Sequence, residues 1–153
     1  MRQRKITVAV LDRAALKEYT NPDRNYVVIS ITDPGRPDAQ LANDPARVDQ
    51  LRLSFHDTDK DEGGTGKNPL VGISLAQARQ IVDFVSKWHR NGIDHFVCQC
   101  EIGIARSSAI AAAILKIHND ANDDSYVFKE DLVYIPNMRV YATVLYAAFG
   151  MTQ

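Results

Sequence analysis

A chain of 153 residues has the length of one domain and can bury a sizeable core. Its 18 basic and 19 acidic side chains give a formal net charge of −1, so no overall field draws it to nucleic acid or to an anionic membrane surface. Its 2 cysteines are too few for a disulfide framework or a structural zinc site, and no run approaches the about 20 apolar residues of a membrane span, so we expect one soluble, cytoplasmic domain over 1–153 without a metal.

The first half of the chain is predicted to contain three strands. Ile6–Leu11 and Tyr26–Ile31 are compact runs of β-branched and apolar residues, which is typical of strands buried on both faces. Ala14–Tyr19 has the composition of a short helix between them. Pro34–Gln50 shows no clear period and is interpreted as a surface loop. Leu51–Phe55 alternates apolar and polar residues, which favours an edge strand or one with a solvated face.

A polar, glycine-rich loop, His56–Gly66, is predicted to follow that third strand. Beyond it, Ser74 and Gln77 have the spacing of a capping box, in which each side chain binds the other residue's backbone amide at the start of a helix. A wide apolar stripe then recurs at helical spacing as far as Asn91-Gly92. We therefore expect an amphipathic helix between Ser74 and Asn91.

The last third of the chain is predicted to hold one strand and two helices. Another apolar strand begins at His95, and the almost wholly apolar run Ala109–His118 is interpreted as a buried helix. An acidic turn follows at Asp120–Asp124, and Pro136 lies at or just before a final helix that Gly150 ends. Strands that alternate with helices predict an α/β domain with a central, mainly parallel sheet of about four to five strands flanked by helices.

The segment from Cys100 to Arg106 is predicted to bind a phosphate group. It joins the strand at His95 to the following helix, and its five intervening residues include Gly103 and no proline, so each amide can point inward. Inward amides, a helix N-terminus and the Arg106 guanidinium converge on one anion. The same positive potential favours the thiolate form of Cys100. Glu101, the one carboxylate here, is expected to project away from the bound dianion.

This loop resembles the signature loop of the cysteine-dependent protein tyrosine and dual-specificity phosphatases. The resemblance covers Cys100–Ser108 and is closest to the dual-specificity branch. It implies a phosphatase-like fold and hydrolysis of phosphate monoesters through a phosphocysteine intermediate, without a cofactor. One position departs from the family pattern, because Gln99 stands where the family usually has a histidine before the nucleophile. In this chain, therefore, no imidazole at the preceding position would help to form the Cys100 thiolate.

The resemblance also implies roles for individual residues. Cys100 would be the nucleophile, Arg106 would hold the phosphate oxygens, and Ser107 would bind the sulfur and ease its departure. A second role for Ser107, as the N-cap of the following helix, is compatible with the first. Cys98 is interpreted as a buried core thiol. The remaining residues expected to form the substrate-binding loop are Glu101, Ile102, Gly103, Ile104 and Ala105.

The general acid must come from another part of the chain. In the family that the loop resembles, it is an aspartate on a mobile loop after a preceding strand. Asp57 occupies that junction here and is the favoured candidate, with Asp59 and Asp61 as rivals because the loop is long. His56 is interpreted as a packing neighbour.

The predicted substrate is a phosphorylated protein or a small phosphomonoester, with phosphotyrosine first, and the sequence leaves open whether phosphoserine or phosphothreonine is also accepted. The loop lacks the lysines of related phosphoinositide phosphatases. Three alternatives stay open at this point. Gln99 and the uncertain acid allow a pseudophosphatase that binds phosphorylated partners. A phosphatase of nucleotides or RNA 5′ ends would need a basic stripe that is not evident, and a rhodanese-like sulfurtransferase fits poorly with Arg106-Ser107.

Overall fold

The computed structural model describes residues 5–59, 61, 69–119 and 135–150 of the chain. The described strands are β1 (Thr7–Leu11), β2 (Tyr26–Thr32), β3 (Arg47–Ser54) and β4 (His95–Gln99). The described helices are α1 (Arg13–Glu18), α2 (Leu75–Arg90), α3 (Arg106–His118) and α5 (Met138–Phe149). The acidic turn predicted at Asp120–Asp124 and most of the glycine-rich part of the predicted loop His56–Gly66 lie outside the described residues.

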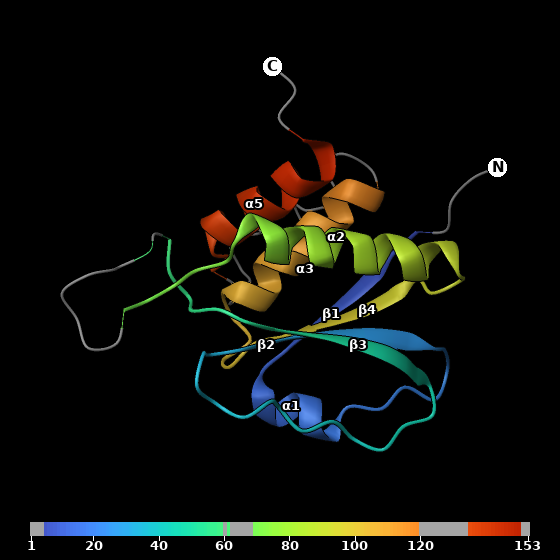
Figure 1. Ribbon diagram of the computed structural model, residues 1–153. Helices are drawn as coiled ribbons and strands as arrows, with labels where there is room; N and C mark the ends of the chain where they lie inside the picture. The colour runs from blue at the N-terminus through green and yellow to red at the C-terminus, as the bar shows by residue number, and fades with distance from the viewer. Residues whose placement is uncertain (1–4, 60, 62–68, 120–134, 151–153) are drawn as a thin grey trace.

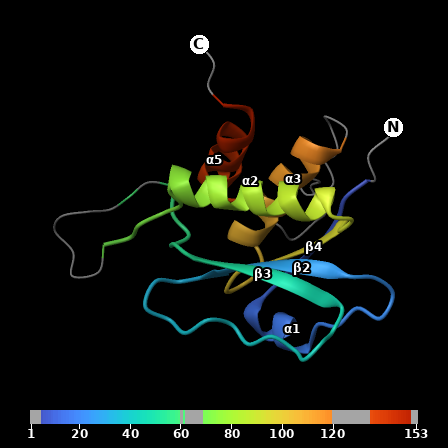
Figure 2. The ribbon, with the colours of Figure 1, turned by 45° about the vertical axis from the view of Figure 1, so that its right-hand side comes forward.

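The four described strands form one sheet in the order β1-β4-β2-β3, and every neighbouring pair is parallel. Helix α1 covers one face, and α2, α3 and α5 cover the other (Figure 1). The view from another side shows the same arrangement, with α1 below the sheet and α2, α3 and α5 above it (Figure 2). The predicted α/β fold with a central parallel sheet flanked by helices is confirmed. Because β4 pairs with both β1 and β2, the loop that follows it leaves the middle of the carboxyl edge.

The core is divided by the sheet into two parts, and β2 contributes to both. Val27, Ile29 and Ile31 pack on the side of α2, α3 and α5, whereas Tyr26 and Val28 pack with α1. Successive side chains of a strand point to opposite faces, so a strand between two covered faces is apolar throughout. The prediction of burial on both faces holds for β2. It is wrong for β1, which is half-buried because it lies at an edge of the described sheet.

Two elements begin earlier in the chain than the apolar pattern predicts. Strand β3 starts at Arg47, inside the segment interpreted as loop, because its backbone pairs with β2 from that residue onward. Helix α3 starts at Arg106 and not at Ala109, since its first three polar side chains are buried and hydrogen-bonded. The N-cap of α3 is therefore Ala105, and Ser107 lies within the helix.

The ends of α2 and the carboxyl end of α5 follow the predicted capping residues. Ser74 and Gln77 form the capping box of α2, which ends at Asn91. Asn137 caps α5 with its side chain, and Gly150 ends that helix at a φ of 71°. Within the described parts of the chain, no helix combines the length and apolar character that crossing a membrane requires.

Candidate active site

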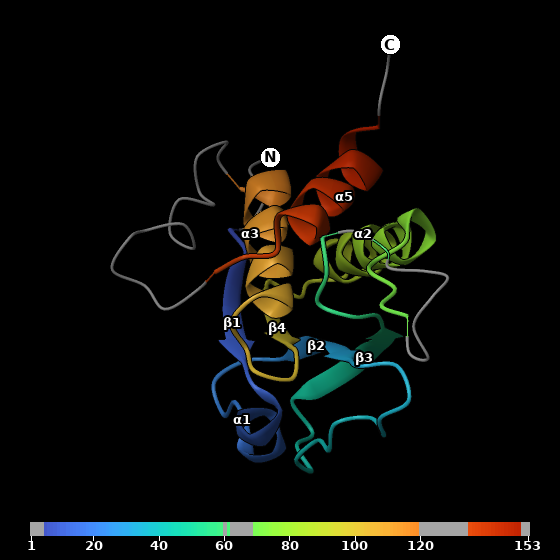
Figure 3. The ribbon, with the colours of Figure 1, turned by 90° about the vertical axis from the view of Figure 1, so that its left-hand side faces the viewer.

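The loop between β4 and α3 packs closely against the junction of β1 and α1 (Figure 3). Gly103 has a φ of 78°, and a Cβ at this position would lie 2.7 Å from the backbone nitrogen of Asp12. A residue with a side chain would therefore be strained by the left-handed backbone conformation, and its Cβ would also collide with the main chain. The amide of Cys100 donates to the carbonyl of Leu11 at 3.3 Å. These contacts hold the loop as a tight turn at the carboxyl edge of the sheet.

Three potential hydrogen-bond donors surround the sulfur of Cys100. The Gly103 amide lies 3.3 Å from Sγ, the Ser107 amide 3.4 Å and the Ser107 hydroxyl 3.1 Å. The residue is 2 % exposed, yet it lines a surface cavity. Hydrogen bonds to an anionic form favour that form over the neutral one. The arrangement suits a sulfur anion at the floor of an open pocket.

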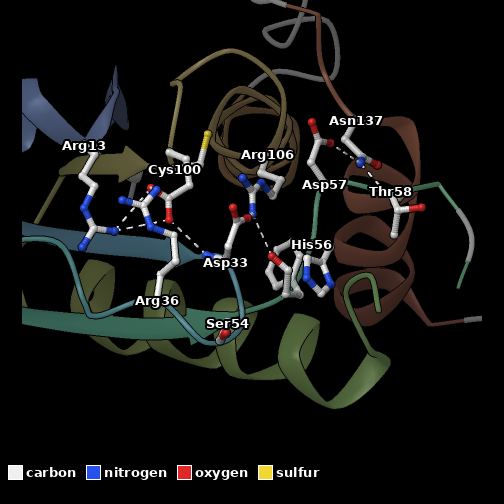
Figure 4. A network of polar contacts seen from close by, with 12 residues as sticks. Arg13, Asp33, Arg36, Ser54, His56, Asp57, Thr58, Cys100, Arg106 and Asn137 are labelled. Carbon is white, nitrogen blue, oxygen red and sulfur yellow. Dashed lines mark hydrogen bonds and ion pairs between the residues drawn. The ribbon is translucent and has the colours of Figure 1, made fainter. Parts of the chain in front are cut away.

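Arg106 is buried at the first turn of α3, where its Nη1 atom makes two hydrogen bonds. Its Nη1 donates to Oδ1 of Asp33 at 2.6 Å and to the carbonyl of Phe55 at 2.8 Å (Figure 4). Among the described residues, its Nε is the buried side-chain nitrogen or oxygen that has no hydrogen-bond partner. A buried donor without an acceptor is costly, so an oxyanion in the adjoining cavity would offset that cost.

Asp33 is a site residue that the sequence analysis did not identify. Its carboxylate pairs with Arg106, and its side chain is 36 % exposed. The available signal was topological. A carboxylate directly after a strand that neighbours β4 must lie beside the β4 loop, since parallel strands end at the same edge.

Glu101 directs its carboxylate to neighbouring loops. It accepts hydrogen bonds from Arg13 at 3.3 Å, from Arg36 at 3.1 Å and from the amide of Asp33 at 3.1 Å. Its side chain is 9 % exposed. The residue after Cys100 therefore ties the loop to the segments that follow β1 and β2.

Gln99 occupies the position where a histidine was expected, and it is fully buried. Its Oε1 accepts a hydrogen bond from Ser30 at 2.5 Å, and its Nε2 donates to the carbonyl of Cys100 at 2.8 Å. This neutral amide holds the Cys100 carbonyl without adding positive charge. Cys98 is also fully buried, and this burial raises the pKa of its thiol, so it remains protonated.

The three candidate acids are placed differently after β3. Asp57 lines the same cavity as Cys100 and Arg106, and its Oδ1 accepts a hydrogen bond from Asn137 at 2.8 Å. Asp59 is exposed, outside the set that lines the cavity. Asp61 binds the Gly72 amide at 3.0 Å and Arg139 at 2.8 Å. That amide, followed by the guanidinium, lowers the pKa of the Asp61 carboxyl, which suits it poorly to donating a proton.

The cavity at this site has a volume of about 250 Å³. Apart from Asp57, Cys100 and Arg106, it is lined by Ile102, Ile104, Ala105 and Ile135. The aliphatic side chains form its rim, where Ile102 is 70 % and Ile135 is 73 % exposed. Among these lining residues Arg106 is the only cation. The site thus combines one anion-binding centre with an apolar mouth.

Comparisons with known proteins identify the fold. No protein-family model matches the sequence, and no curated protein matches it. The structure is similar to human DUSP28, with a TM-score of 0.59 and 14% identity over 92% of this chain and 90% of that chain. It is also similar to the human tyrosine phosphatase-like serine/threonine/tyrosine-interacting protein, with a TM-score of 0.54 and 16% identity over 78% of this chain and 74% of that chain.

A third similar structure is that of PTPMT1 in complex with PI(5)P, with a TM-score of 0.52 and 20% identity over 81% of this chain and 76% of that chain. Structures at such low identity establish a shared architecture. The chain therefore has the fold of the protein tyrosine and dual-specificity phosphatases.

Proposed function

We propose that this chain hydrolyses phosphate monoesters, phosphotyrosine in proteins above all, through a phosphocysteine intermediate on Cys100. One observation carries the proposal. The Cys100 sulfur, the guanidinium of Arg106 with its unpartnered Nε, and the Asp57 carboxyl line one cavity of about 250 Å³. These are a nucleophile, an anion-binding group and a proton donor, which together are what a phosphate dianion with a poor leaving group requires.

In the first proposed step, the Cys100 thiolate attacks phosphorus as the bond from phosphorus to the ester oxygen breaks. Asp57 gives its proton to the departing oxygen, so an alcohol or phenol leaves. Arg106 and the inward amides hold the non-bridging oxygens of the transferring group. The Asp33 carboxylate, 2.6 Å from Nη1 of Arg106, fixes the plane of that guanidinium.

In the second proposed step, water attacks the phosphocysteine and the sulfur–phosphorus bond breaks. The Asp57 carboxylate takes the proton of that water, and inorganic phosphate is released. The sulfur leaves as an anion, which the Ser107 hydroxyl at 3.1 Å is placed to stabilise. Side chains and main-chain amides supply every group that these steps use.

The aliphatic rim supports an aromatic ester as the preferred substrate. Ile102, Ile104 and Ile135 present branched side chains at the mouth of the cavity, where they would contact a phenyl ring. The residues between Cys100 and Arg106 include no lysine that would bind the further phosphates of an inositol lipid. These features favour a phosphorylated protein over a polyphosphorylated headgroup.

A second candidate function is a module that binds phosphorylated partners without processing them. The observation that favours it is Gln99, a buried neutral amide where a histidine was expected. Such a module would use the same anion-binding loop and lack turnover.

Turnover of p-nitrophenyl phosphate, compared between the unmodified chain and Cys100→Ser, separates these functions. We expect the unmodified chain to turn over and the variant to lose essentially all activity while it still binds tungstate, an unreactive tetrahedral oxyanion. Iodoacetate should alkylate Cys100 at neutral pH, and tungstate should protect it. Turnover retained by Cys100→Ser would contradict the thiolate mechanism. Tungstate binding by an unmodified chain without turnover would select the binding module.

A further inference from the structure

The segment Ile135–Arg139, at the start of α5, contacts both halves of the candidate site. Its backbone is tied to the nucleophile loop, because the Ile135 amide donates to the carbonyl of Ile104 at 3.2 Å and the Asn137 amide donates to the carbonyl of Ala105 at 3.0 Å. The beginning of α5 is thereby fixed relative to the residues that lie between the sulfur and Arg106.

The same segment also holds the loop that carries the proposed acid. Nδ2 of Asn137 donates to Oδ1 of Asp57 at 2.8 Å and to the carbonyl of Thr58 at 3.2 Å (Figure 4). Two residues later, Arg139 binds Asp61 at 2.8 Å and the carbonyl of Ile73 at 2.9 Å. The loop after β3 is therefore pinned to α5 at two points.

The orientation of the Asn137 amide follows from its second task. Its Oδ1 accepts a hydrogen bond from the Val140 amide at 3.0 Å, which caps α5. An asparagine has one acceptor oxygen and one donor nitrogen at its end. Because the oxygen is used by the helix, the nitrogen must face Asp57, and the bond to Asp57 is a donated one.

We propose, on the basis of the proposed function, that Asn137 positions the general acid by fixing which oxygen of Asp57 carries the proton. A protonated carboxyl has one oxygen that only accepts and one that bears hydrogen. Asn137 donates to Oδ1, so the proton is placed on Oδ2. That proton goes to the leaving oxygen in the first step, and Oδ2 takes one from water in the second.

Asn137 also sets the distance between the two reacting groups. Its backbone is bonded to Ala105 beside the nucleophile loop, and its side chain is bonded to the acid. One residue thus spans from the loop that holds the sulfur to the carboxyl that serves the leaving group. A displacement of about 1 Å at this point is of the size that costs about 10²-fold in rate.

The test compares two aryl phosphates that differ in their need for an acid. Phenol, with a pKa of about 10, leaves poorly without a proton, whereas p-nitrophenol is far more acidic and leaves more easily. Asn137→Ser retains a good N-cap oxygen for α5 and lacks the amide donor. We expect kcat/KM for phenyl phosphate to fall about 10- to 100-fold, with a clearly smaller fall for p-nitrophenyl phosphate, and unchanged tungstate affinity.

A double-mutant cycle with Asp57→Asn strengthens the test. If Asn137 acts through Asp57, the double variant should lose no more activity than Asp57→Asn alone, because coupled residues are not additive. Asn91→Ser, the same exchange at the C-cap of α2, is the matched control and should leave both substrates unaffected.

Asn137→Asp serves if the serine variant does not fold. It retains an N-cap oxygen for α5 and removes the amide donor, so kcat/KM for phenyl phosphate should again fall more than kcat/KM for p-nitrophenyl phosphate. A purely structural role for Asn137 predicts equal losses for the two substrates.

Two results would overturn the assignment of Asn137. They are equal losses for both substrates in the Asn137 variants, or full additivity with Asp57→Asn. If the unmodified chain turns over neither substrate, the proposed function fails and this assignment fails with it. If the unmodified chain is active and Asn137→Ser matches it on both substrates, only the role of Asn137 is contradicted.

Discussion

The two sides of the candidate site are built in different ways. One side, which we call the nucleophile side after the role proposed for Cys100, is one contiguous loop in which Gly103 and Ser107 are hydrogen-bonded to the Cys100 sulfur within eight residues. The other, which we call the acid side after the role proposed for Asp57, depends on contacts between distant segments, since Asp57 and Asn137 are 80 residues apart in the chain. Cys100 is 2 % exposed, whereas Asp57 is exposed. The hydrogen bonds to the Cys100 sulfur come from within its own loop, whereas the contact between Asp57 and Asn137 requires the folded sheet and α5.

This difference predicts two mutational signatures. In the proposed reaction, groups on the nucleophile side hold the phosphoryl group, which is the same in every substrate, so their loss should affect all aryl phosphates alike. Groups on the acid side would serve the leaving oxygen, so the effect of their loss should depend on the leaving group. The predictions below would sharpen or break this distinction.

After the loss of the Cys100 sulfur, the largest effect is expected at the proposed acid. Asp57→Asn removes the proposed proton donor and should lower kcat/KM for phenyl phosphate by about 10² to 10⁴, with a much smaller loss for p-nitrophenyl phosphate. Steady-state kinetics with both substrates measure this, and Asp59→Asn is a matched control on the same loop. Equal losses for the two substrates would break the distinction. An unchanged rate would transfer the role of acid to Asp59 or Asp61.

A smaller effect is expected at Asp33. Asp33→Asn replaces a charged partner of Arg106 by a neutral one and frees the guanidinium to turn away from the cavity. Loss of one charge-assisted hydrogen bond of this kind should cost about tenfold in kcat/KM. The loss should be equal for both aryl phosphates and should be accompanied by weaker tungstate binding, measured by calorimetry. A loss that varies with the leaving group would instead place Asp33 on the acid side.

The last prediction concerns the stability of the fold, and it lies outside the site, at the amino end of β4. His95 is 6 % exposed, and burial, followed by the Arg24 charge, lowers its pKa from 6.5 to about 4. Between pH 6.5 and pH 4, His95 is therefore mostly protonated in the unfolded chain and mostly neutral in the folded chain. The free energy of unfolding should consequently fall as the pH drops from 7 toward 4. We expect a loss of about 1 to 2 kcal/mol at pH 5.

Urea unfolding at pH 7 and pH 5 measures this loss, and His95→Gln should reduce the difference between the two values. His118, whose pKa burial also lowers, contributes in the same direction. A stability that rises on acidification would show that His95 is protonated in the folded chain. Because His95 is at the opposite end of the sheet from the loop, its exchange should leave the leaving-group dependence unchanged.

The sequence predicted the parts of the molecule that depend on nearby residues. The order of strands and helices, the capping box at Ser74 and the loop from Cys100 to Arg106 are all recognisable within short windows of the chain. The spacing of apolar residues did not predict where two elements begin, because strand pairing and the burial of polar side chains determine those positions. Strand β3 extends back to Arg47 because β2 offers it a partner, and α3 begins with buried polar residues.

The contacts of the site that the sequence did not predict are those between elements. Asp33 is recognisable as a partner of Arg106 only once β2 is known to lie beside β4. Asn137 follows Pro136 in a segment that was predicted only as the start of a helix. Its contact with Asp57 depends on how α5 packs against α2 and α3, which no local pattern specifies.

The way in which Gly103 lies against the backbone of Asp12 has a consequence for altering substrate choice. The turn is maintained by main-chain contacts, so the side chains of Ile102 and Ile104 are not needed to shape the loop between Cys100 and Arg106. They remain available to select what is attached to the phosphate. Libraries randomised at these two positions should yield chains with new ester preferences and an intact oxyanion site, whereas any residue larger than glycine at position 103 should destroy both.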